Sequence, residues 1–226
     1  MPFDFTKIVA APVKPVPLLL LLDASSSMTG PKIDELNKAV REMISSLSGE
    51  VAVTAPVQLA AIAFSGSGAR LLFPFTDVRK AEWRDLTCAG GTPLDSALQM
   101  ARDIINGTSA EAKLPKPCYR PTVVLVSDGE PNDGYEVPLN EFVASGSRTA
   151  SCVRLSLCIF GPHGKTPKQR EVMHTFASDA GNVIDSNEAE KISEFFQLVT
   201  MSVSSRSRSS NPDIADLKLE QYSNHI

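Results

Sequence analysis

Two apolar runs of this chain each lead into an aspartate, and hydroxyl side chains follow the first of them. Residues 18–22 are leucines that precede Asp23, and the pattern continues as Asp23-x-Ser25-x-Ser27. Residues 123–126 are Val-Val-Leu-Val and precede Ser127 and Asp128. Oxygen ligands from Asp and Ser, with no His or Cys among them, suit a hard divalent ion such as Mg²⁺, or Mn²⁺, rather than zinc.

These residues can act together only if the two runs are neighbouring strands. Their continuous apolar character is typical of parallel strands buried on both faces. The carboxyl ends of such strands meet at one edge of the sheet, where open α/β folds bind their ligands. A Gly-Gly-Thr-Pro turn that contains Thr92 lies between the runs in the sequence and is a third candidate loop for that edge.

The remaining pattern alternates strands with amphipathic helices, which predicts a doubly wound α/β fold with helices on both faces of the sheet. The two apolar runs on either side of Ser-Gly-Ser-Gly (65–68) are too close together for a parallel crossover and predict an antiparallel edge hairpin. We therefore expect a mostly parallel, six-stranded sheet with one antiparallel edge strand. The expected strands are 16–23, 59–64, 70–75, a strand ending at 128, 153–160 and 182–184, and the expected helices are 31–47, 93–105, 139–144, 167–180 and 188–203.

Composition is compatible with one domain and short tails. The chain has 226 residues, 42% of them hydrophobic, and a formal charge of −4. Its charges are interspersed, so nothing favours nucleic acid or an anionic membrane as a partner. The four cysteines lack CxxC spacing, which argues against a zinc ribbon or a disulfide framework and favours a reducing, cytoplasmic location. We expect a lead-in over 1–15, the domain over 16–203, and a flexible Ser/Arg tail over 204–226 that could end in a short helix.

The three motifs occur in the order and context of the metal-ion-dependent adhesion site of von Willebrand factor A domains, which the chain resembles from about residue 18 to residue 203. The resemblance implies that the Ser25 and Ser27 hydroxyls bind the metal directly. It implies that Thr92, Asp23 and Asp128 bind directly or through water. One coordination position then stays open for an Asp or Glu of a partner protein.

Within this family the chain is most similar to small bacterial TerY-like proteins associated with tellurium resistance and stress. The similar segments include Gly90-Gly91-Thr92-Pro93-Leu94, the run from Ser127 to Asp133, and the Phe195-Phe196 helix before a Ser-rich stretch. This resemblance implies a non-enzymatic scaffold in a bacterial signalling set. Kinase-like or phosphatase-like proteins of the same operon are then the implied partners.

Simpler interpretations exist for each motif. Asp23 and Asp128 could be ordinary polar strand ends, the two serines could solvate a loop, and Thr92 could cap a helix. A magnesium-dependent hydrolase or phosphotransferase is the enzymatic alternative, although such enzymes usually place a second acid where Ser25 stands. A third hypothesis, after the binding module and the enzyme, is a structural subunit that binds its partner through the C-terminal tail. We assign no catalytic residue, because no histidine has a carboxylate or nucleophile partner in the sequence.

Overall fold

A six-stranded sheet forms the centre of the molecule. The computed structural model describes residues 13–50, 54–132, 134–160, 164 and 166–213. The strand order is β3-β2-β1-β4-β5-β6, and among these strands of the described residues only the β2/β3 pair is antiparallel. The expected mostly parallel sheet with one antiparallel edge is confirmed. The strands are β1 (Val16–Asp23), β2 (Val57–Ser65), β3 (Gly68–Asp77), β4 (Thr122–Ser127), β5 (Val153–Ile159) and β6 (Val183–Ser186).

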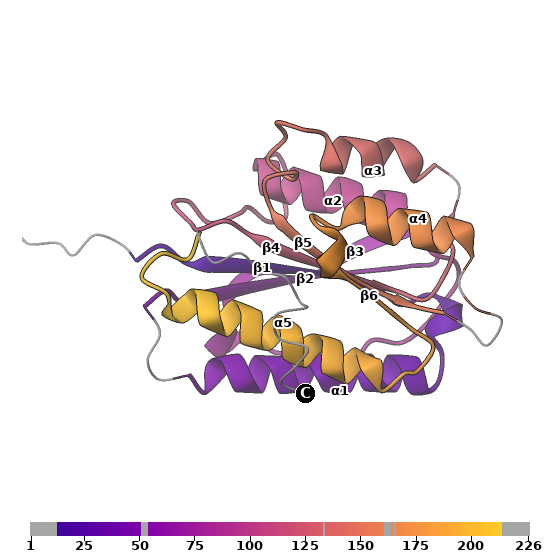
Figure 1. The fold of residues 1–226 in the computed structure, drawn as a ribbon, viewed down its shortest axis with the longest axis horizontal. Coiled ribbons are helices and arrows are strands. Elements are labelled where there is room, and N and C mark those ends of the chain that lie inside the picture. The colour runs from indigo at the N-terminus through magenta and orange to yellow at the C-terminus, as the bar shows by residue number, and fades with distance from the viewer. Residues whose placement is uncertain (1–12, 51–53, 133, 161–163, 165, 214–226) are drawn as a thin grey trace, which may run out of the picture.

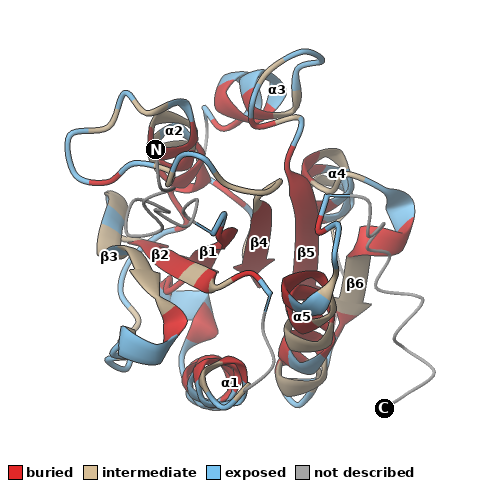
Figure 2. Ribbon diagram, turned by 90° about the vertical axis from the view of Figure 1, so that its left-hand side faces the viewer, coloured by how far each residue is buried: buried red, intermediate tan, exposed pale blue. Residues whose placement is uncertain are grey.

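Helices cover both faces of this sheet (Figure 1). One layer contains α1 (Pro31–Ser48) and α5 (Lys191–Arg208), and the other contains α2 (Leu94–Asn106), α3 (Glu136–Val143) and α4 (Pro167–Phe176). All eight residues of β1 are buried, as expected for a central strand covered on both sides. Figure 2 shows the buried residues gathered on the inner strands and on the helix faces that turn toward them.

Local sequence signals set several helix ends. Gly30 adopts φ +86°, which a residue with a side chain rarely does, and Pro31 then occupies the first position of α1. Thr166 and Gln169 form a capping box at the start of α4. Gly107 ends α2 in the left-handed conformation, which glycine adopts without strain.

Helix α4 ends at Phe176, earlier than the expected limit near residue 180. The Arg154 guanidinium donates a hydrogen bond to the Phe176 carbonyl at 2.7 Å, which satisfies a carbonyl that the helix leaves free. A short 3-10 turn, η4 (Ala180–Asn182), then leads into β6.

The end of α5 corrects the tail boundary that the sequence indicated at residue 204. The helix continues to Arg208, and Ser204, Arg206 and Ser207 are buried. The Arg206 guanidinium donates to Thr122 Oγ1 at 2.8 Å and to the carbonyls of Arg120 and Pro212. This segment docks through polar contacts, which a search for apolar periodicity does not detect. The expected short helix near the C-terminus and most of the expected lead-in lie outside the described residues.

Candidate metal centre

Neighbouring strands bring the two aspartates to one edge of the sheet. Strands β1 and β4 pair in parallel with Leu22 opposite Val126. Asp23 is therefore the last residue of β1, beside Ser127, and Asp128 follows directly after β4. The Ser127 hydroxyl donates a hydrogen bond to Asp23 Oδ2 and links the two strand ends.

Asp23 is a fully buried carboxylate. Its Oδ1 accepts the backbone N–H of Ser25 at 2.8 Å, and its Oδ2 accepts the Ser127 hydroxyl. Burial raises the pKa of Asp23 to about 6, and the hydrogen bonds from Ser127 and Ser25 oppose this rise without cancelling it. A buried carboxylate held in this way is a favourable ligand for a cation.

The hydroxyls of Ser25 and Ser27 connect the β1 loop to Asp128. Ser25 Oγ lies 3.0 Å from Ser27 Oγ, and the Ser27 hydroxyl donates to Asp128 Oδ1 at 2.6 Å. The short 3-10 turn η2 (Ser26–Met28) turns the chain so that both hydroxyls face this point. Four of the five predicted residues thus form one continuous set of contacts.

Thr92 joins the same set through a close approach to Gly129. A Cβ atom on Gly129 would lie 2.7 Å from Thr92 Oγ1 and 3.4 Å from Ser27 Oγ. Only glycine fits here without displacing these hydroxyls, which explains the glycine directly after Asp128. The structure therefore brings all five predicted residues together.

The Thr92 loop is also held by its neighbours. Asn132 accepts the Thr92 N–H through its Oδ1 at 3.2 Å and donates its own N–H to the Thr92 carbonyl at 2.9 Å. At the β2–β3 turn, the Gly66 N–H donates to the Ala89 carbonyl at 3.0 Å. A Cβ on Gly90 would lie 2.4 Å from Gly66 Cα, so the two backbones touch.

Two residues of the site were not expected from the sequence. The Lys32 ammonium, from the first turn of α1, forms an ion pair with Asp128 Oδ2 and bonds to the Ser27 carbonyl at 3.3 Å. Gln169 Nε2, from the start of α4, donates to the Asp128 carbonyl at 3.0 Å. Both come from other elements, so no local motif in the sequence indicates them. Asn132 also supports the site, because its side chain and backbone both bond to Thr92.

The donor atoms fit a hard cation. The five side chains offer two carboxylates and three hydroxyls on three loops. Within the described ranges, nowhere do three or more His, Cys, Asp or Glu side chains form a metal-binding group. The candidate centre depends instead on hydroxyl oxygens, which suit Mg²⁺ or Mn²⁺ better than a soft metal.

This α/β sheet with clustered oxygens at its carboxyl edge defines a class of ligand-binding domain, and comparison with known families identifies which one. The family profile of the von Willebrand factor type A domain matches residues 18–198. The chain belongs to this family. A search of curated proteins gives no match.

Solved structures with low sequence identity share the fold. Proximal thread matrix protein 1 from the mussel byssus, solved with a zinc-occupied MIDAS motif, is 17% identical with a TM-score of 0.59, over 84% of this chain and 46% of that chain. The pilus adhesin SpaC from Lactobacillus rhamnosus GG, in an open conformation, is 16% identical with a TM-score of 0.65, over 85% and 30%. The vWF domain of the type V pili tip protein Mfa5 from Porphyromonas gingivalis is 13% identical with a TM-score of 0.60, over 89% and 99%.

This chain thus spans less than half the length of the first two proteins and nearly all of the Mfa5 domain. None of the described helices has the length and apolar content needed to cross a membrane.

Proposed function

We propose that this domain is a non-enzymatic protein-binding module that holds a divalent cation and uses it to bind an acidic side chain of a partner. Asp23, Ser25, Ser27, Thr92 and Asp128 would be the metal ligands of a metal-ion-dependent adhesion site. The observation that carries this proposal is the set of contacts among Asp23, Ser25, Ser27 and Asp128 at one edge of the sheet, with Thr92 Oγ1 facing the same side of Gly129 as Ser27 Oγ.

Each residue has a distinct part in this site. Ser25 and Ser27 supply neutral oxygens, while Asp23 supplies a buried negative charge held in place by Ser127. Asp128 is oriented by Ser27 and by Gln169. The cation, Mg²⁺ or Mn²⁺, would supply an electron-poor centre with a free position for a partner's Asp or Glu.

The family and its structural neighbours support a binding role. The neighbours include a pilus adhesin, a pilus tip protein and a matrix protein of the byssus, one of them with a zinc-occupied MIDAS motif. The resemblance to TerY-like proteins supports the finer proposal of a cytoplasmic scaffold in a bacterial stress or tellurium-resistance system, whose partners would be kinase-like or phosphatase-like proteins.

The first test is capture of partners on the immobilised protein from a bacterial lysate, in Mg²⁺ and again in EDTA. The double variant Ser25→Ala/Ser27→Ala should lose both Mg²⁺ binding in calorimetry and the metal-dependent partners. Ser46→Ala, an exposed serine on α1, is the matched control. Partners retained equally by the double variant would refute the proposal.

An enzymatic activity would give a different result. Release of phosphate from p-nitrophenyl phosphate that requires Mg²⁺ and disappears in Asp23→Asn would favour the hydrolase. Because Ser25 occupies the place of a second acid, we expect no such release.

A further inference from the structure

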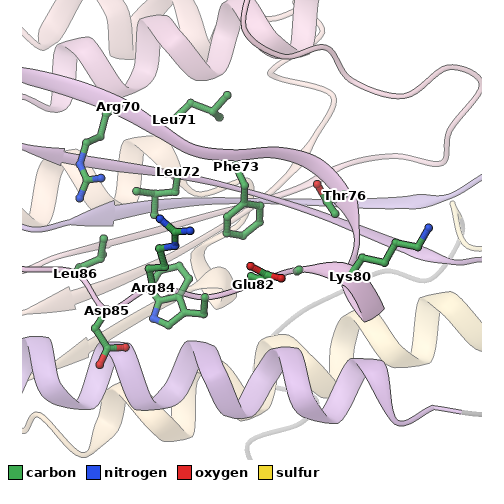
Figure 3. A pocket seen from close by; sticks show the side chains of 12 residues that line it. Arg70, Leu71, Leu72, Phe73, Thr76, Lys80, Glu82, Arg84, Asp85 and Leu86 are labelled. Atoms are coloured by element: carbon green, nitrogen blue, oxygen red, sulfur yellow. The ribbon is translucent and has the colours of Figure 1, made fainter.

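A groove runs along β3 at the antiparallel edge of the sheet (Figure 3). Its volume is about 480 Å³, and it lies between β3 and the segment 80–86. Among the strands of the described residues, β3 lies at the edge of the sheet and pairs only with β2. None of the five candidate metal ligands lines this groove.

The groove has an apolar floor. Leu72, Phe73 and Trp83 are half-buried and pack against the core beneath them. The wall opposite β3 is fixed to α1, because Asn37 Oδ1 accepts the Leu86 N–H at 2.8 Å and the Trp83 Nε1–H at 3.3 Å. The shape of the groove is therefore set by the fold and does not need a ligand to form.

Two exposed guanidinium groups flank this floor. Arg70 rises from β3 and Arg84 from the opposite wall, and Figure 3 shows the Arg84 side chain extending toward β3. Neither forms an ion pair or hydrogen bond with any part of the chain that the structure describes. Two acidic residues, Glu82 and Asp85, also line the groove. Asp85 forms an ion pair with Arg41, whereas Glu82 forms no ion pair with a described residue. The groove thus carries excess positive charge from the side chains best suited to bind carboxylates.

The edge of β3 is open over a short length. No backbone hydrogen bond links residues 70–73 to any described residue beyond β2. Pro74 follows, and the pairing with β2 shifts register at this point, so the open edge is interrupted. An extended peptide of a few residues is the ligand that such an edge accepts, by adding a strand.

The groove also lies near the candidate metal centre. Arg70 pairs with Ala63, and Ala63 pairs with Leu22, the residue before Asp23. Two strand spacings of about 4.8 Å place the Arg70 backbone roughly 10 Å from β1. The opposite wall continues through residues 87–91 into Thr92, so one partner chain could span both sites.

We propose that this groove binds a short, extended acidic segment of a partner protein. The apolar side chains of the segment would pack against Leu72, Phe73 and Trp83, and its carboxylates would pair with Arg70 and Arg84. The proposal adds a metal-independent contact to the metal-dependent one and does not rely on it. The overall acidic charge of the chain disfavours a nucleic acid as the ligand.

The test is fluorescence polarisation with a fluorescein-labelled peptide, Glu-Phe-Glu-Leu-Glu-Val, in Mg²⁺ and in EDTA. We expect binding in both solutions, and a loss of about tenfold or more in Arg70→Gln/Arg84→Gln. Arg208→Gln, an exposed arginine at the end of α5, should bind like the wild type. Circular dichroism and thermal unfolding establish that each variant is folded.

Three results would overturn the proposal. The first is unchanged binding in the double variant, and the second is equal binding of Lys-Phe-Lys-Leu-Lys-Val or of a single-stranded oligonucleotide. The third is loss of all binding in EDTA, which would place the peptide on the metal centre. This last outcome supports the proposed function while refuting the groove, so the two proposals fail separately.

Discussion

Asp23, a candidate metal ligand, costs stability in the metal-free protein. Its carboxylate is fully buried, and burial raises its pKa to about 6 from an ordinary value of 3.8. The folded protein then holds this proton more tightly than the unfolded chain. Its contribution to the free energy of unfolding therefore falls as pH rises from about 4 to about 6.

We expect Asp23→Asn to stabilise the metal-free protein at pH 7. A shift of this size corresponds to about 3 kcal/mol, an upper bound on the gain. At pH 4, where the wild-type carboxyl is protonated in the folded state, the gain should vanish. Denaturant unfolding in EDTA at the two pH values measures this, with the exposed Glu111→Gln as control.

In saturating Mg²⁺ at pH 7 the wild type should become more stable than Asp23→Asn, because a ligand that binds only the folded wild type stabilises it. A variant that is less stable than the wild type in EDTA at pH 7 would contradict this view of Asp23.

Lys32 occupies a position where it would compete with a metal for Asp128. Its ammonium pairs with Asp128, whose side chain is inaccessible to solvent. Two cations near one carboxylate repel each other, so the ammonium would lower the affinity of the candidate site for a metal. The same ammonium stabilises the metal-free protein by neutralising Asp128.

Lys32→Met should therefore bind Mg²⁺ about three- to tenfold more tightly and unfold at a lower temperature in EDTA. Calorimetry and thermal unfolding give the two values. Lys38→Met, which removes an exposed lysine paired with Glu35, is the control and should change neither by much. Weaker Mg²⁺ binding in Lys32→Met would mean that the lysine supports the site.

At the level of elements, apolar periodicity was enough to predict the strands and helices but not all their ends. The run of leucines in β1 and the stripes on α1 and α2 are local signals, and the structure confirms them. The last turns of α5 are held by Arg206 and serines, which have no apolar pattern. Lys32 and Gln169 were not predicted as part of the site because they reach it from α1 and α4. Contacts between separate elements produce no residue spacing in the sequence from which they could be predicted.

Arg206 should be essential for the end of α5. Burial lowers the pKa of its guanidinium to about 10, yet it stays charged at neutral pH. Arg206→Met removes the donor to Thr122 and to two carbonyls, and should cost about 2–4 kcal/mol of unfolding free energy. Arg208→Met, exposed two residues later, should cost much less. Equal effects in urea unfolding would show that Arg206 does not anchor the helix.

The whole molecule combines a well-buried sheet with an edge that carries the candidate metal centre. Each layer of helices packs on its own apolar cluster. None of the four cysteines forms a disulfide with another described residue, and Cys152 and Cys158 are buried while Cys88 and Cys118 are half-buried. Thiol reactivity therefore reports on the integrity of the fold.

Cys152 should not react with Ellman's reagent in the native protein at pH 8, because burial raises its pKa to about 12. We expect only Cys88 and Cys118 to react slowly in buffer and all four cysteines to react in guanidinium chloride. Cys152→Ser should leave unchanged the number of thiols that react in the native protein. A native protein that labels at Cys152 would imply that β5 opens readily.

The contact between Gly66 and Gly90 limits how this protein can be engineered. Hairpin tips are usually tolerant places for a fluorescent label or an inserted epitope. Here the β2–β3 tip lies against the backbone of the Thr92 loop, and Gly66 bonds to Ala89. An insertion at this tip would displace the loop and perturb the candidate metal centre from a distance. A reporter is better placed beyond α3, where Gly146 has open space around it.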